Sequence, residues 1–160
     1  MGVLKMAEQI TNMEKYENYR EQMGRLKKAI EAKFFLEAVF IEYAVMEDRL
    51  ESIIRYSGTW NYKPNAIVQI GPKLKKIYDM SLNEENLIHK YFPAEFIVEI
   101  DEWKEKRNPY IHSLLKQKIK TADLEEFALQ GQEIVKKLNS ASTSYKRALQ
   151  KQNEKNTPKK

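Results

Sequence analysis

Apolar residues recur every three or four positions through most of this chain, which is the spacing of one face of an α-helix. The first such stripe follows Thr11-Asn-Met-Glu14, a capping-box sequence that opens a helix. Its members are Tyr16, Tyr19, Met23, Leu26 and Ile30. From Phe34 to Met46 almost every residue is apolar, so we expect that segment to be buried on most sides. The pattern fits either one long kinked helix or two helices in succession, with Gly58 as the C-cap.

The middle of the chain has a different composition. Residues 58–72 contain two glycines and two prolines and are expected to form a loop, in which residues 66–70 have the composition of a short strand. Pro72 suits the first turn of a short helix that reaches Tyr78. A second capping sequence, Ser81-Leu-Asn-Glu84, predicts a further helix near residues 84–91.

Pro109 interrupts the next helical pattern. A helix is expected from Pro93, with one stripe formed by Phe96, Ile100, Trp103 and Arg107. Proline lacks a backbone N–H and disfavours the helical conformation of the residue before it. We therefore expect a break at Asn108-Pro109, where Asn108 caps a new helix and His112 lies in its first turn.

Together these elements predict an all-α, up-and-down bundle of about four to six helices. Thr121 is expected to cap the last helix, in which Gly131 favours close contact with a neighbouring helix. The inward-facing residues of that helix are expected to be Leu124, Phe127, Ala128, Ile134, Val135 and Leu138. The chain of 160 residues suits one domain, expected at residues 11–150, with an N-terminal extension at 1–10 and a basic disordered tail at 151–160.

The amino-acid composition limits the kinds of site and partner that this chain can have. The chain has no cysteine and only two histidines, His89 and His112, so we expect neither a metal nor a cofactor. Charged residues occur throughout the first twenty positions, and the most apolar run is too short to span a bilayer. A cytoplasmic protein without membrane association is therefore expected. The net charge of +5 favours polyanionic partners such as RNA.

The segment from Arg107 to His112 carries the residue types that phosphate chemistry requires. Arginine is always charged and binds phosphate through two N–H groups, whereas histidine gives or takes a proton near neutral pH. An arginine followed by asparagine, with a histidine after four intervening residues, late in a helical chain, resembles the hallmark of the HEPN family. The resemblance covers roughly residues 10–150 of this chain.

This resemblance implies a metal-independent endoribonuclease from a toxin–antitoxin or antiphage-defence system. In such an enzyme the RNA 2′-OH attacks the adjacent phosphate and leaves a 2′,3′-cyclic phosphate and a 5′-hydroxyl. Arg107 would stabilise the developing charge, His112 would transfer protons, and Asn108 would orient the histidine or contact phosphate. Because one such histidine per chain is few for two proton transfers, the resemblance also implies a homodimer with its two motifs across a two-fold axis. An antitoxin or regulatory protein is a further implied partner.

Several residues around the motif are candidates for supporting roles. Glu42 lies in the apolar run, where an ionised carboxylate needs a partner. Either it pairs with Arg107 and pre-orients the guanidinium, or it faces solvent beside Glu37 on a narrow polar strip. The expected RNA contacts flank or lie within the motif and are Lys104, Lys106, Tyr110 and Lys116.

Two other functions fit the same elements. A non-catalytic helical interaction or dimerisation module of a defence or toxin–antitoxin complex has the same predicted fold. It differs from the nuclease in that Arg107 and His112 need not share a cleft that is open to solvent. A helical DNA-binding protein fits less well, because no helix-turn-helix with a compact glycine turn is apparent.

Overall fold

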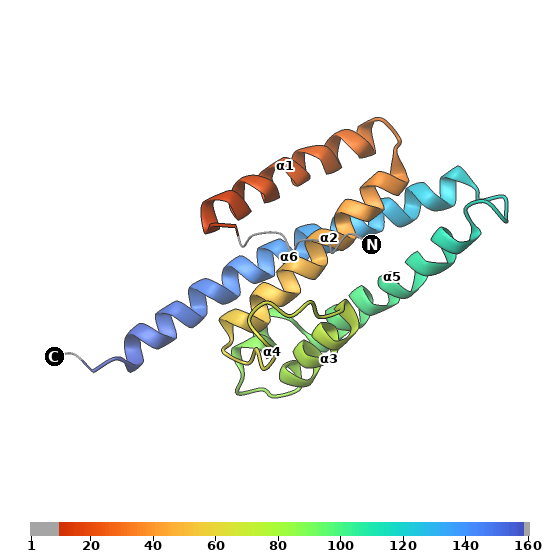
Figure 1. The fold of residues 1–160 in the computed structure, drawn as a ribbon. Helices are drawn as coiled ribbons and strands as arrows, with labels where there is room; N and C mark the ends of the chain where they lie inside the picture. The colour runs from red at the N-terminus through yellow and green to blue at the C-terminus, as the bar shows by residue number, and fades with distance from the viewer. Residues whose placement is uncertain (1–9, 159–160) are drawn as a thin grey trace, which may run out of the picture.

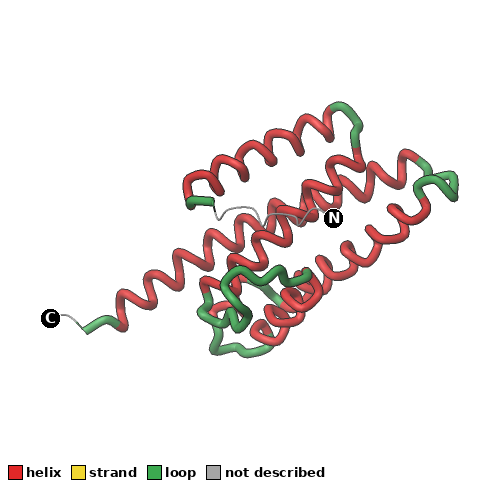
Figure 2. Tube along the Cα trace, in the orientation of Figure 1, coloured by secondary structure: helices red, strands yellow, loops and turns green. Residues whose placement is uncertain are grey.

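The computed structural model describes residues 10–158, and within them the chain folds as a bundle of six helices without strands (Figures 1 and 2). The predicted all-α class is therefore confirmed. The strand considered at residues 66–70 is loop up to Gln69, and Ile70 begins a helix. All but one residue of the expected N-terminal extension lie outside the described range. The helices are α1 (Asn12–Glu31), α2 (Phe35–Tyr56), α3 (Ile70–Ser81), α4 (Leu87–Tyr91), α5 (Ala94–Ser113) and α6 (Thr121–Asn156).

Helix α2 is the centre of the bundle and packs against α1, α3 and α6. Its burial follows from the nearly continuous apolar run in its first half, as predicted. The chain reverses between α1 and α2 at Lys33, whose φ of 62° lies in the left-handed region. The two segments are therefore separate helices and not one kinked helix. The fully buried residues of α2 include Ala38, Met46, Leu50, Ile53 and Ile54.

The predicted capping box of α1 is confirmed, whereas the C-cap of α2 is Ser57, one residue before the predicted Gly58. The Thr11 hydroxyl accepts a hydrogen bond from the Glu14 N–H at 3.2 Å, and the Glu14 carboxylate accepts one from the Thr11 N–H at 2.7 Å. This is the reciprocal arrangement of a capping box. Gly58 follows the end of α2 with a φ of 75°, a conformation that favours glycine.

Two predicted helix starts are displaced. Ser81 is the last residue of α3, and its hydroxyl donates to the Tyr78 carbonyl at 2.6 Å. Ser81 thus belongs to α3, and the cap of α4 is Asn86, whose side chain accepts from the Ile88 N–H at 2.9 Å. Helix α6 begins at Thr121 itself, without a side-chain cap.

Helix α5 continues through Pro109, so the predicted break at Asn108-Pro109 is wrong. Asn108 caps no new helix, and His112 lies in the last turn of α5 and not in the first turn of another helix. Proline removes the hydrogen bond to the carbonyl four residues earlier. That residue, Glu105, and Pro109 itself are both exposed, so the lost hydrogen bond falls on the solvent side of α5. The local cost of Pro109 is therefore not enough to end the helix.

Helix α6 runs the whole length of the bundle and projects beyond it at the C-terminal side (Figure 1). Its predicted core residues are buried, except that Leu124 is only partly buried. Residues 151–156, which we expected to belong to a disordered tail, are helical. They are mostly lysine, glutamine and glutamate, which sustain a helix once it has been nucleated. No helix among residues 10–158 is long and apolar enough to cross a membrane.

Candidate functional site

The motif occupies the last part of α5, which runs antiparallel to α2 (Figure 1). Arg107 is half-buried, and its Cζ lies 3.6 Å from the centroid of the Tyr43 ring on α2. None of the ion pairs among the described residues involves Arg107. The predicted pair between Glu42 and Arg107 is therefore wrong, and the guanidinium rests on the aromatic ring next to that glutamate.

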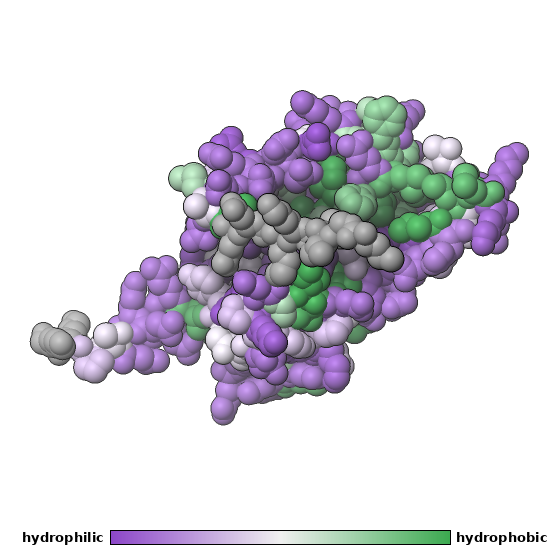
Figure 3. Space-filling view, viewed as in Figure 1, coloured by the Kyte–Doolittle hydropathy of each residue, from purple (hydrophilic) through white to green (hydrophobic). Residues whose placement is uncertain are grey.

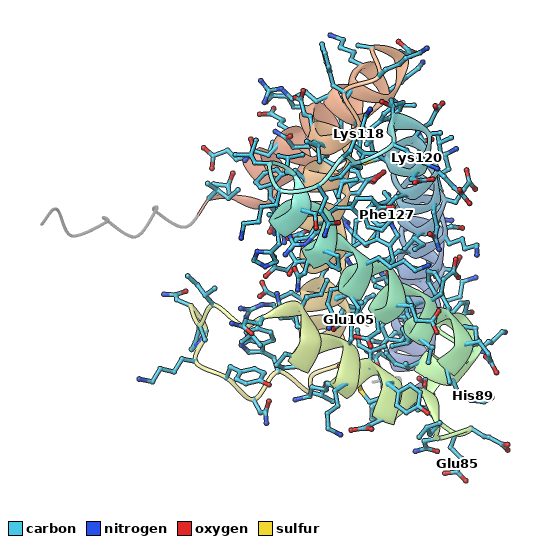
Figure 4. All side chains as sticks on the ribbon, turned by 90° about the vertical axis from the view of Figure 1, so that its right-hand side faces the viewer. Glu85, His89, Glu105, Lys118, Lys120 and Phe127 are labelled. Carbon is cyan, nitrogen blue, oxygen red and sulfur yellow. The ribbon has the colours of Figure 1, made fainter. Side chains whose placement is uncertain are left out.

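Asn108 and His112 are both exposed and lie one turn apart on the same face of α5. Arg107 and His112 lie five positions apart on the continuous helix, so their side chains leave it about 140° apart. One chain therefore does not bring both side chains into a common cleft. The other histidine, His89, lies at the opposite end of α5 (Figure 4), and its Nδ1 is 2.7 Å from the Ser81 carbonyl oxygen.

Glu42 is fully buried, and neither carboxylate oxygen has a hydrogen-bond partner among the described residues. It lies between α2, α5 and α6, against Trp103 and Gly131. A Cβ atom placed on Gly131 would come within 2.7 Å of the Trp103 ring and closer still to the Glu42 carboxyl group. The predicted close helix contact at Gly131 is thus confirmed. Of these two glutamates Glu37 is exposed and Glu42 is buried, so the solvent-facing alternative for Glu42 is also wrong.

Burial raises the pKa of Glu42 from its ordinary value of 4.5 to about 9. The side chain is therefore a neutral acid at physiological pH. The indole N–H of Trp103 donates to the Phe127 carbonyl at 3.1 Å and does not serve Glu42. The apolar run around Glu42 indicates an unusual carboxyl group, but this group is accommodated by keeping its proton and not by pairing with a cation.

The expected RNA contacts differ in their availability. Lys104 is held by Asp101 at 2.9 Å and Glu105 at 3.0 Å, so its charge is already compensated. The Tyr110 ring stacks on Phe127 of α6, with 4.9 Å between ring centroids, which leaves that face unavailable to a base. Burial also raises the pKa of the Tyr110 hydroxyl. Lys106 is exposed.

A basic loop, residues 114–120, connects α5 to α6 beside His112. Its three lysines are exposed, and Figure 4 shows two of them at the same end of the bundle as the end of α5. This loop places positive charge next to the histidine without compensating carboxylates of its own. The lysines are Lys116, Lys118 and Lys120.

Exposed apolar side chains surround the motif. The contact between Arg107 and Tyr43 fixes the register of the two antiparallel helices, so residues after 107 lie beside residues before 43. Leu115 is 97% exposed and Phe40 is 74% exposed. Figure 3 shows hydrophobic residues gathered where the first half of α2 and the end of α5 meet. We call this the apolar end surface and define it as Leu36, Phe40, Ile111, Leu114 and Leu115.

Comparisons with protein-family models, with curated proteins and with solved structures found no match. Among the described residues, no three histidine, cysteine, aspartate or glutamate side chains form a group that could hold a metal ion. Tyr43 is the residue of this region that sequence reasoning missed. Only its position next to Glu42 on the central helix pointed toward it.

Proposed function

We propose that this protein is a metal-independent endoribonuclease of the HEPN type, whose active site is completed by a second copy of the chain. The observation that carries the proposal is the state of Arg107. Its guanidinium is fixed against Tyr43 and has no carboxylate partner among the described residues, although the chain contains 23 acidic residues. A positioned arginine with uncompensated charge is suited to bind a phosphodiester.

The proposal requires two copies because the side chains of Arg107 and His112 diverge around α5. A two-fold axis near the end of α5 brings His112 of one copy toward the motif of the other. The apolar end surface supports this arrangement, since Ile111, Leu114 and Leu115 flank His112 along the chain. Its most prominent side chains, Phe40 and Leu115, are largely exposed. Contiguous exposed apolar surface of this kind commonly marks a protein interface.

In the proposed reaction one His112 accepts the proton of the RNA 2′-OH as that oxygen attacks the adjacent phosphorus. The His112 of the second copy donates a proton to the departing 5′-oxygen. Arg107 stabilises the charge that accumulates on the phosphorane oxygens, and Asn108 lies one turn before His112, where it can orient the imidazole. The basic loop binds the RNA backbone beside the motif.

The test is cleavage of end-labelled RNA by the purified full chain in the presence of a chelator. Wild type should yield products that end in a 2′,3′-cyclic phosphate. His112→Ala should lower the rate by at least about a hundredfold, which is a typical effect of removing a general acid–base, with helical content unchanged. Arg107→Ala should lose on the order of a hundredfold, and Arg107→Lys should recover only part of it because the bidentate geometry is lost.

His89→Ala is the matched control, since it removes the other exposed histidine, which lies on α4 at the opposite end of α5 from His112. It should cleave at the wild-type rate. Intact RNA after incubation with dimeric wild type, or equal losses in His89→Ala and His112→Ala, would overturn the nuclease proposal.

A non-catalytic interaction or dimerisation module is the second candidate, and the apolar end surface is the observation that favours it. In that case the motif lies inside a protein interface and Arg107 is a packing residue. A dimer that leaves RNA intact would support this candidate.

If the protein is a nuclease that acts as a toxin or defence effector in the cytoplasm, its activity has to be controlled. An antitoxin or regulatory protein that covers the same end of the bundle would block both the motif and the pairing of two copies.

A further inference from the structure

We infer that Tyr43 is the positioning residue for Arg107: its ring face holds the guanidinium while the terminal N–H groups remain free for phosphodiester oxygens. This inference rests on the proposed function. It starts from the 3.6 Å separation between Arg107 Cζ and the Tyr43 ring centroid, which is van der Waals contact with the face of the ring.

The contact differs from the two other close arginine–ring contacts among residues 10–158. Arg55 lies 4.0 Å from the Trp60 ring centroid but also pairs with Glu51 and donates to the Pro64 carbonyl. In the second case the ring centroid of Tyr19 lies 4.2 Å from the Cζ of Arg49, and this arginine also pairs with Asp48. In both cases an acidic side chain also contacts the guanidinium, although the Nε of Arg49, like that of Arg107, has no hydrogen-bond partner among the described residues.

At Arg107 the ring is the fixing element, and no acceptor among the described residues uses the N–H edge. Its Nε is buried and has no hydrogen-bond partner. This buried N–H is out of reach of an external acceptor, so a ligand would have to bind through the terminal nitrogens. The two terminal nitrogens are not buried in this way. A tetrahedral phosphate, which accepts two parallel N–H bonds, is the ligand class that this edge fits.

The choice of a ring has a chemical consequence. A carboxylate at the position of Tyr43 would hold the guanidinium equally well, but it would occupy the N–H edge and cancel the charge. An aromatic face holds the cation through its π electrons and leaves both the edge and the net charge intact. Tyr43 is well placed for this task because it belongs to α2, the central helix of the bundle.

The experiment compares Tyr43→Leu, which removes the ring face, with Tyr43→Phe, which keeps it, and with Tyr19→Leu as a matched control. Tyr19→Leu removes the ring beneath Arg49, away from the motif. With RNA as substrate, Tyr43→Leu should lower kcat on the order of tenfold, Tyr43→Phe should recover most of that loss, and Tyr19→Leu should match wild type. Helical content and dimerisation are measured on the same samples.

A second readout follows Arg107 directly and does not need cleavage. The Arg107 Nε–H signal in NMR should be shifted upfield by the ring in wild type and Tyr43→Phe, and this shift should be absent in Tyr43→Leu. Addition of an oligonucleotide with a 2′-deoxy residue at the scissile position should move the wild-type signal. If the signal moves but intact RNA is never cut, the positioning role stands and the proposed nuclease fails.

Three results would overturn the inference. Tyr43→Leu that folds and cleaves with the wild-type kcat shows that the ring is not needed. Tyr43→Phe that is as impaired as Tyr43→Leu shows that the hydroxyl matters and the ring face does not. If Tyr43→Leu does not fold, the NMR signal of Arg107 in wild type decides the question. The positioning role of Tyr43 is excluded if that signal shows no ring shift or does not respond to the oligonucleotide.

Discussion

Replacing the buried acid Glu42 with glutamine should remove a large part of the pH dependence of this protein's stability. The carboxyl group is fully buried, has no hydrogen-bond partner among the described residues, and has a pKa of about 9. Glutamine has nearly the same shape but carries no charge at any pH. The substitution therefore removes the ionisation of this position and changes little else.

The sign follows from proton binding. Folding raises the pKa of Glu42 from 4.5, so the native state retains a proton that the unfolded chain releases. The stability contributed by the protonated acid is fully present below pH 4.5 and is lost as pH rises toward 9. Each pH unit within this window costs about 1.4 kcal/mol. Between pH 5 and pH 8 the loss amounts to ~4 kcal/mol, a large fraction of the 5–15 kcal/mol typical of a domain.

The assay is urea denaturation of wild type and Glu42→Gln at pH 5, pH 6.5 and pH 8, at one fixed protein concentration because assembly affects apparent stability. The difference in unfolding free energy should move by ~4 kcal/mol in favour of Glu42→Gln across this range. Glu37→Gln, at an exposed position of the same helix, is the control and should follow wild type. Parallel pH profiles for wild type and Glu42→Gln would refute the reasoning.

Two further outcomes follow from the structure. Gly131→Ala should lower the unfolding free energy by roughly 1–3 kcal/mol, because its methyl group meets the Trp103 ring, whereas Gly24→Ala in open space within α1 should raise it by up to about 1 kcal/mol. A gain in both variants, measured by urea denaturation, would contradict the close contact. Leu115→Asp should produce a monomer in light scattering while Ile67→Asp, at an equally exposed apolar residue of the loop before α3, remains a dimer. Dimerisation of both variants would exclude the apolar end surface as the interface.

The sequence predicted the features that depend on neighbours along the chain. The capping box at Thr11, the left-handed Gly58 and the inward residues of α6 are set by local hydrogen bonding and periodicity. Pro109 predicts a break through its local penalty, whereas α5 continues because the position of that proline on the exposed side of the helix matters as well.

The candidate site also combines features that the local sequence predicts with features that depend on packing between helices. The carboxylate of Glu42 within the apolar run suggested Glu42 as one possible partner of Arg107, whereas in the structure Arg107 contacts the neighbouring residue Tyr43. Adjacent residues on a helix point about 100° apart, so the choice between them depends on how the helix is rotated within the bundle. That rotation is set by packing of α2 against three other helices, which no local pattern records.

The length of α6 allows the orientation of two associated copies to be measured as a distance. Its 36 residues extend about 54 Å, from Thr121 beside the basic loop to Asn156 beyond the rest of the bundle. A spin label at Lys155 therefore lies far from the motif of its own chain. If two copies associate through their motif ends, two such labels are separated by a distance on the order of 100 Å, whereas association through the opposite ends brings them close together. One distance measurement then reports which end of the bundle forms the dimer.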